Sequence, residues 1–188
     1  MNTQEIREIL SCSVPKSYRT TVLPADKLNA VSSQQFAIVA NSQNSNQPGM
    51  HWIAMFKNRR SKEVEFFDSC AMPIDFYSPT FEAFLGSKAD IIRMSALRIQ
   101  PGTSNACGHF SIYYLLHRVR GTSFEQILQS FDEFDLESND RIVREFVGEN
   151  FHSSNLLVTK KQNTLQELGS EVSTIIQCCE ILEQLLQL

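Results

Sequence analysis

The segment that most restricts the fold of this 188-residue chain is the strongly apolar stretch from Ala106 to Arg120. Ser104 or Asn105 is suited to cap its amino end and Gly121 follows its carboxyl end, so the stretch is predicted to be a helix. A helix with so few polar positions has to be enclosed by other elements. We therefore expect it to be buried in the domain, with Cys107 in its first turn.

Two strand-like segments, residues 51–56 and 64–69, flank a charged turn and predict an antiparallel hairpin. A turn centred between Arg59 and Arg60 fixes which residues face each other across the two strands. On this register the facing pairs are Ile53 with Phe66, Met55 with Val64, and His51 with Asp68. One face of the hairpin is thus expected to carry a hydrophobic ladder that ends in a His/Asp pair.

The rest of the chain predicts further helices and strands around this helix and hairpin. Expected helices are residues 3–10, 80–85, 123–131 and 140–146; expected strands are 36–40 and 91–99; residues 11–33 are expected to be irregular. Together these elements predict an α+β fold with a central helix packed on a mixed sheet. The length suits one domain spanning residues 1–188.

The C-terminal segment, residues 164–188, is predicted to be a long helix with an apolar stripe. Apolar residues recur in it at a regular spacing of three and four positions. Such a stripe has to be covered by the domain, by a partner or by a second copy of the chain.

Composition excludes several functional classes. Net charge is −4 and pI about 5.6, which argues against an extended nucleic-acid-binding face. No segment is apolar enough to span a membrane, and the start, MNTQEIREILSCS, lacks the apolar core of a secretory signal, so we expect a nuclear or cytosolic protein that is not secreted. Five irregularly spaced cysteines favour free thiols. The cysteine and histidine spacings do not match those of zinc sites, so no metal site is expected.

Four residue types needed for thiol-based acyl transfer occur in suitable contexts. Cys107 lies in a helix's first turn, where the peptide dipoles favour the thiolate. His51 is the candidate base, and Asp68 the group that orients it. Gln100, seven residues before the cysteine, is the candidate oxyanion donor, and Gly108 leaves the approach to the thiol open.

Each of these residues also has a structural interpretation when it is considered alone. A cysteine at a helix start is often a small buried apolar residue, a strand histidine is often only a satisfied polar group, and a glutamine before Pro-Gly is often a loop residue. The joint arrangement favours catalysis. A noncatalytic binding module that works through residues 164–188 stays as the alternative from a different class.

The segments FAIVANSQNSNQPGMHWIAMFKNRRSKEVEFFDS and RIQPGTSNACGHFSIYYLLH resemble the adenovirus maturation protease family, also called adenain. The same type of papain-like cysteine protease occurs in Polinton or Maverick elements and is related to the proteases that process SUMO. The similarity covers roughly residues 36–118. It implies an endopeptidase that matures viral or virus-like capsid and core precursors; a peptidase specific for SUMO or ubiquitin-like proteins is the alternative.

The resemblance also implies roles for individual residues. His51 matches the base, Asp68 the acidic member, Gln100 the oxyanion amide and Cys107 the nucleophile. Trp52 matches an aromatic residue that narrows the cleft so that it admits glycine near the scissile bond.

The resemblance further implies where the protein works and what activates it. It suggests the host nucleus or cytoplasm, or the virus particle. Adenovirus enzymes are activated by a cysteine-linked peptide and by DNA, but Ala89 stands near the corresponding cysteine position and the chain is acidic. We therefore expect no required cofactor, peptide or DNA.

Overall fold

The computed structural model describes residues 1–150, and the expected C-terminal helix, residues 164–188, lies outside the described residues. No helix in the described part is long and apolar enough to cross a membrane.

The helices are α1 (Thr3–Ser13), α2 (Pro79–Gly86), α3 (Cys107–Val119) and α4 (Phe124–Gln129), with 3-10 turns η1 (Ala25–Ala30) and η2 (Ile74–Phe76) and a helical segment over residues 136–150. The strands are β1 (Arg19–Pro24), β2 (Phe36–Asn41), β3 (Trp52–Lys57), β4 (Glu63–Phe67) and β5 (Ile91–Met94).

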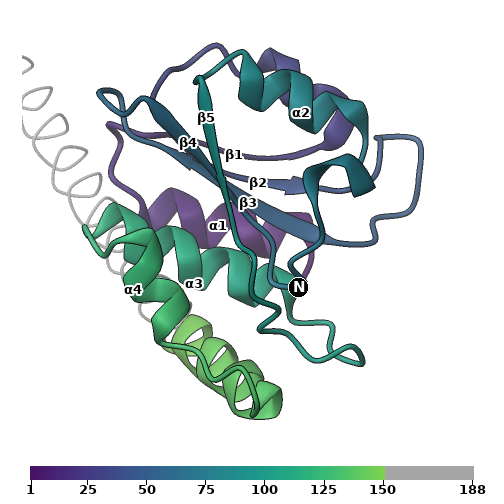
Figure 1. Cartoon of the computed structure of the whole chain (residues 1–188), viewed down its shortest axis with the longest axis vertical. Coiled ribbons are helices and arrows are strands. Elements are labelled where there is room, and N and C mark those ends of the chain that lie inside the picture. Colours follow the sequence, from purple (N-terminus) through teal and green to yellow (C-terminus); the bar gives the residue numbers. More distant parts are fainter. Residues whose placement is uncertain (151–188) are drawn as a thin grey trace, which may run out of the picture. The chain divides into compact units, whose positions relative to one another are not determined.

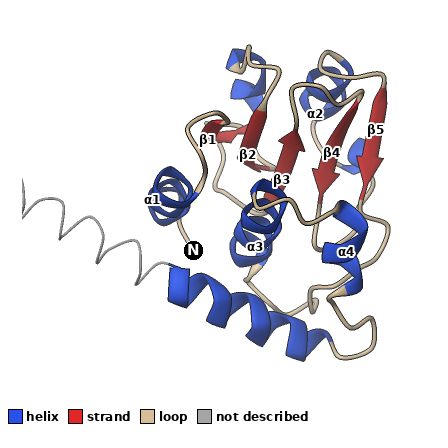
Figure 2. Cartoon of the chain, turned by 90° about the vertical axis from the view of Figure 1, so that its left-hand side faces the viewer, coloured by secondary structure: helices blue, strands red, loops and turns tan. Residues whose placement is uncertain are grey.

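The strands form one mixed sheet with helices on both faces. They follow each other in the order β1-β2-β3-β4-β5; β1 is parallel to β2, β3 is antiparallel to β2 and β4, and β5 is parallel to β4. Figure 1 shows α2 on one side of the sheet and α1 and α3 on the other, an arrangement that is also visible from a second direction in Figure 2. The α+β fold predicted from the sequence is confirmed.

Each face of the sheet buries its own set of apolar side chains. On the α2 side the core contains Phe36, Ile38, Phe66, Phe81 and Phe84, among others. On the opposite side Tyr114 of α3 stacks on Phe67 of β4, with ring centroids 4.2 Å apart and an interplanar angle of 4°. The helix expected to be buried is therefore confirmed as a central element, with nine of its residues, Cys107 to Leu116 except His109, buried.

The predicted register of the hairpin is wrong by two residues. The observed pairs are Ala54 with Phe67, Met55 with Phe66 and Phe56 with Glu65. The turn is centred later than predicted because Ser61 closes it, donating its N–H to Asn58 and accepting the N–H of Glu63 at 3.0 Å. Side chains alternate between the two faces of a sheet, so a register shift of two residues leaves each side chain on the face that was predicted. The hydrophobic ladder on one face of the hairpin is therefore kept.

Two other predicted segments differ from the structure. Residues 11–33, expected to be irregular, contain β1 and η1; β1 buries only Val22 fully, so it lacks the alternating pattern by which strands are recognised. The strand expected over residues 91–99 ends at Met94. Beyond it, Ser95 bonds to the backbone of Asp68 and Ile99 to that of Ser69, so the chain runs past the end of β4 toward the site.

A buried ion pair fixes the far end of α3 to the sheet. Arg118 donates from Nε and Nη2 to the two carboxylate oxygens of Glu65 on β4, each at 2.7 Å, and Tyr114 also donates to this carboxylate. The guanidinium lies 4.6 Å from the centre of the Phe56 ring. The middle of the strand that leads to Asp68 is thereby joined to the end of α3 that lies farthest from Cys107.

We predict that Arg118→Ala destabilises the protein much more than Arg93→Ala. Removing one partner of a buried pair leaves the Glu65 charge uncompensated, and costs about 3–5 kcal/mol in the free energy of unfolding. Arg93 pairs with Glu63 and Glu125 but is one-third exposed, so its loss costs about 1 kcal/mol or less. Urea unfolding of both variants measures the two values; equal destabilisation would contradict the assignment.

Candidate active site

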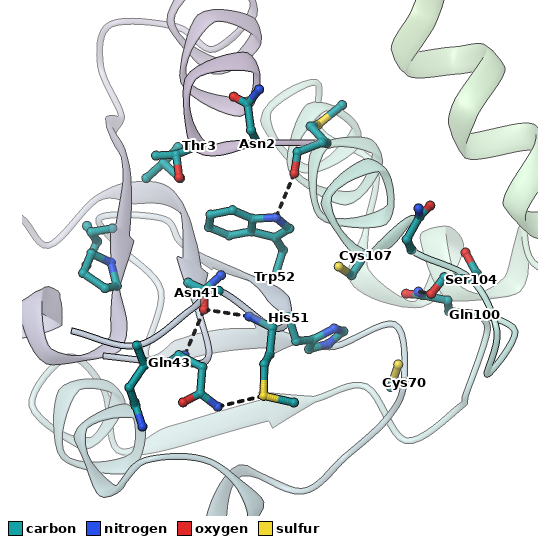
Figure 3. Close-up of a pocket in the computed structure, with 18 of the residues that line it drawn as sticks. Asn2, Thr3, Asn41, Gln43, His51, Trp52, Cys70, Gln100, Ser104 and Cys107 are labelled. Atoms are coloured by element: carbon teal, nitrogen blue, oxygen red, sulfur yellow. Dashed lines mark hydrogen bonds between the residues drawn. The ribbon is translucent and has the colours of Figure 1, made fainter. Parts of the chain in front are cut away.

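Of the four residues predicted to carry the chemistry, three line one cleft, and the fourth, Asp68, is buried behind His51. His51 immediately precedes β3, Asp68 immediately follows β4, Cys107 begins α3, and Gln100 lies in the connection between β5 and α3. His51, Gln100 and Cys107, together with Trp52, line a cavity of about 780 Å³, called here the cleft. Figure 3 shows Cys107 with Trp52 on one side and Gln100 on the other, and with His51 nearby.

Asp68 is fully buried and holds the imidazole of His51. The His51 Nε2 lies 2.6 Å from Asp68 Oδ1, which also accepts the N–H of Cys70 at 2.9 Å. The other oxygen accepts the N–H of Met72 and the hydroxyl of Tyr77, each at 2.8 Å. Burial raises the pKa of Asp68, but hydrogen bonding and the charge of His51, with the other donors, lower it overall. The group is therefore a carboxylate.

The pair does not form by direct opposition across the hairpin, as the sequence predicted. Continued beyond the last observed pair, the register places Cys70 opposite His51, and Asp68 lies diagonally from it. Both catalytic candidates lie just outside the strands, where the backbone is free to turn. Ala71, with a φ of 54°, closes a turn on Asp68 through an N–H bond of 3.0 Å to its carbonyl, and the turn aims the neighbouring N–H groups at the carboxylate.

Tyr77 is a part of the site that sequence reasoning missed. Its ring lies nearly parallel to that of His51, with centroids 6.2 Å apart and an interplanar angle of 8°, while its hydroxyl binds Asp68. It comes from the connection between η2 and α2, and the sequence contains no local pattern that marks it. It fixes both the carboxylate and the plane of the imidazole.

The electrostatics of the cleft favour a thiolate and an imidazolium. Burial lowers the pKa of His51, but hydrogen bonds to Asp68 and Cys107 and their charges raise it to about 9. Burial raises the pKa of Cys107, but the hydrogen bond and charge of His51, with the backbone N–H groups of Trp52 and Gly108, lower it overall. Because Nε2 is taken by Asp68, Nδ1 is the nitrogen that faces the sulfur.

The amino end of α3 differs from the predicted one in a way that serves this thiolate. The N-cap is Ala106, and no side chain of the described residues caps the helix. Ser104, expected as a cap, instead accepts the N–H of Ala106 at 3.0 Å and donates to Asp140. The first N–H groups of the helix are thus not occupied by a capping oxygen, and their partial positive charge acts on Cys107.

Gln100 lines the cleft, and hydrogen bonds hold its side-chain amide at both the oxygen and the nitrogen. The side chain is buried, its Oε1 accepts the hydroxyl of Ser69 at 2.6 Å, and its Nε2 donates to the carbonyl of Ser104 at 2.9 Å. An amide nitrogen has two hydrogens, so a second donor stays available. Ser69, which fixes this orientation with Ser104, was not singled out from the sequence because it acts on a residue distant in the chain, and Ser104 was singled out only as a helix cap.

Trp52 forms a wall of the cleft, and Gly108 makes its position possible. The indole Nε1 donates to the carbonyl of Met1 at 3.3 Å. A Cβ on Gly108 would lie 3.2 Å from Trp52 Cδ1 and 3.3 Å from Met1 Cβ, closer than side chains usually pack. Gly108 is buried and does not itself line the cleft, so the structure gives it a packing role beside Trp52, and its role toward substrate stays a prediction.

The remaining candidate ligands and nucleophiles are less suited to catalysis. Cys70 has its pKa raised to about 11 by burial and by Asp68. His109 has its pKa lowered to about 4 by burial and by Arg144. Among the described residues, His51, Asp68 and Cys70 have ligand atoms within 4.8 Å of one another, but N–H and O–H donors already occupy the carboxylate, so the set does not suit a metal ion. Cys178 and Cys179 lie outside the described residues.

Comparison with known proteins found similar structures but no match by sequence. No protein-family model matches the chain, and no curated protein matches its sequence. Two crystal structures of the ASFV pS273R protease have TM-scores of 0.42 and 0.46 at 19% and 17% identity; they cover 55% and 67% of this chain and 41% and 60% of the matched chains. ChlaDub1 from Chlamydia trachomatis has a TM-score of 0.47 at 12% identity, covering 80% of this chain and 79% of the other. Identities and scores this low transfer no activity, so function is inferred from the cleft itself.

We predict that alkylation of Cys107 and peptide hydrolysis diverge at alkaline pH. Because the pKa of His51 is raised to about 9, its proton persists up to that pH and is lost above it. Alkylation requires only the thiolate and stays fast above pH 9, whereas hydrolysis also requires the proton and declines. Iodoacetamide labelling located by peptide mass, beside hydrolysis rates, measures both curves.

The matched variants are His51→Ala and His117→Ala. The first should move the midpoint of the alkylation curve to higher pH, since His51 is the main group that lowers the thiol pKa. The second changes a histidine that packs on Tyr113 and Phe146, away from the cleft, and should leave the midpoint in place. An unchanged midpoint in His51→Ala would rule out the ion pair.

Proposed function

We propose that the chain is a cysteine endopeptidase that cleaves at Gly-containing sites and matures capsid and core precursor proteins of a virus or virus-like element. The single observation that carries the peptidase assignment is the position of Cys107. It occupies the uncapped start of α3 beside a histidine that is bonded at 2.6 Å to a buried aspartate, and Gln100 lines the same cleft.

In the acylation step the Cys107 thiolate attacks the scissile carbonyl carbon. The negative charge that develops on the carbonyl oxygen is met by the free hydrogen of the Gln100 amide and by the backbone N–H of Cys107. His51 then gives its Nδ1 proton to the departing amine as the C–N bond breaks, leaving a thioester on Cys107. Asp68 keeps the imidazole oriented throughout and stabilises its positive charge.

In the deacylation step His51, now neutral, takes a proton from water. The resulting hydroxide attacks the thioester carbonyl, with the same two donors on the oxygen, and the C–S bond breaks. The thiolate and the protonated His51 are restored. The high pKa of His51 favours this resting ion pair at neutral pH.

The preference for glycine is supported by the wall that Trp52 forms. Its indole is held against Gly108 and Met1, so the ring is close to the helix start that carries the nucleophile. A substrate residue without a side chain passes such a wall with the least steric cost. The choice of capsid precursors over SUMO or ubiquitin-like tails rests on the sequence resemblance alone.

The decisive experiment is intact-mass spectrometry after treatment with a Gly-Gly peptide that carries a vinyl or propargyl warhead. Wild type should gain one adduct, which is absent in Cys107→Ala and at least tenfold slower to form in His51→Ala. The reaction is run without added DNA or peptide, because we propose that no cofactor is required. Adducts only at other cysteines would overturn the assignment of the nucleophile.

The protein substrate is tested by parallel incubation with capsid-derived precursors and with SUMO and ubiquitin fusions. Cleavage of the precursors at Gly-containing sites is the expected result. Rapid cleavage of the modifier fusions alone would replace the capsid assignment by the alternative, a ubiquitin-like-protein peptidase, without affecting the assignment of the catalytic residues.

We further predict that Gln100→Ala lowers kcat about 10²–10³-fold with little change in KM, because the lost donor acts mainly in the transition state. Gln129→Ala, an exposed glutamine on α4, is the matched control and should retain full activity. Circular dichroism checks that Gln100→Ala keeps the fold. A change confined to KM would assign Gln100 to ground-state binding instead.

A further inference from the structure

A second cavity, of about 620 Å³, adjoins the cleft, and it is called here the side pocket. Its apolar lining consists of Met50, Met72, Phe76 and Tyr77. Its lining contains none of Cys107, Gln100 and Trp52; the residues it shares with the cleft are Gln43, Asn44, Gln47, Met50, His51, Cys70 and Arg98. The imidazole of His51 is therefore the catalytic group that the two cavities have in common.

This division of the catalytic groups determines which half of a substrate each cavity can take. The acyl half becomes bonded to Cys107 with its oxygen toward Gln100, so it must occupy the cleft. The leaving half receives its proton from His51 and departs from beside that ring. A cavity that contains His51 but neither the nucleophile nor the oxyanion donor is thus on the leaving-group side.

We propose that the side pocket is the subsite for the leaving-group segment and selects a bulky apolar residue directly after the scissile bond. This inference rests on the proposed function and adds its specificity. Together the cleft and the side pocket would favour a Gly-Gly sequence followed by phenylalanine, leucine or methionine.

The apolar preference follows from the side chains that line the pocket. Met50 and Phe76, which both line the side pocket, are 75% and 63% exposed, and an apolar substrate side chain would cover them. Gln43 Nε2 contacts the Met50 sulfur at 3.2 Å, which places the flexible thioether at the boundary of both cavities.

Tyr77 connects the side pocket to the His51 and Asp68 pair. Tyr77 is anchored by its hydroxyl to Asp68 and by ring contacts to Phe76 at 5.3 Å and Phe81 at 5.9 Å. Arg98 also lines the pocket and disfavours a basic substrate residue by charge repulsion. Asp68 does not line the pocket, and its charge is paired with that of His51.

The test uses quenched fluorescent peptides of the form Gly-Gly-X, with X as Phe, Leu, Gly, Asp or Lys on the leaving side, and the full-length chain. Wild type should have kcat/KM about tenfold or more higher for Phe than for Gly. Phe76→Ala and Met50→Ala should each reduce this Phe/Gly ratio severalfold, mainly through KM. Phe134→Ala, which removes an 89%-exposed ring that lines neither cavity, should leave the ratio as in wild type.

The outcomes separate this inference from the peptidase assignment. Cleavage that depends on Cys107 but is equally fast for every X would overturn the subsite and leave the proposed function standing. An equal loss for all peptides in Phe76→Ala would also overturn it, because a merely structural role produces no selectivity change. If no peptide is cleaved in a Cys107-dependent way, the proposed function itself fails.

Discussion

The Asp68 carboxylate has no contact with solvent, and the geometry of the site follows from how its charge is accommodated. Burying an unpaired carboxylate costs so much free energy that the group becomes protonated or the structure around it unfolds. Here four donors surround it: the imidazole of His51, two backbone N–H groups of the turn at Ala71, and the hydroxyl of Tyr77. The same bonds that make the charge tolerable therefore fix the histidine, the turn after β4 and Tyr77, which lines the side pocket.

The start of α3 lacks the side-chain cap that would stabilise it. A serine or aspartate at the N-cap would stabilise the helix by about 1 kcal/mol, but its oxygen would occupy the N–H groups that lower the pKa of Cys107. Ala106 stands there instead, and Ser104 is engaged elsewhere. Such a departure from local preference is typical of functional sites, where the rest of the fold supplies the missing stability.

The parts of the fold that were predictable depend on local pattern, and the parts that were not depend on distant partners. The apolar stretch of α3, the run of β2 and the Ser78-Pro79 start of α2 have periodic or capping signals within a few residues. β1 has none, because its pairing with β2 rather than its own side chains makes it a strand. The hairpin turn is closed by a backbone bond and a hydroxyl bond of Ser61, and a turn centred between Arg59 and Arg60 does not take these bonds into account.

The same distinction holds within the candidate site. Cys107, His51, Asp68 and Gln100 were found because their residue types and spacing suggest a reaction, and the structure brings them together; their roles stay predictions. Tyr77, Ser69 and Ser104 are common residue types whose importance arises only from what they touch after folding. Trp52 and Gly108 were singled out, but their mutual packing needed coordinates.

The ion pair between Arg118 and Glu65 fixes α3 at its carboxyl end, so a small tilt of the helix displaces Cys107 at its amino end. Eleven residues separate Cys107 from Arg118, a distance of about 16 Å at the rise of an α-helix. A tilt of about 4° around the anchored end displaces the sulfur by about 1 Å, a misplacement that is able to cost about a hundredfold in rate. If Cys107 is the nucleophile, as proposed, substitutions that loosen this distant contact and leave the protein folded should slow the reaction without touching substrate. The position of the Cys107 sulfur then depends on the whole length of the helix.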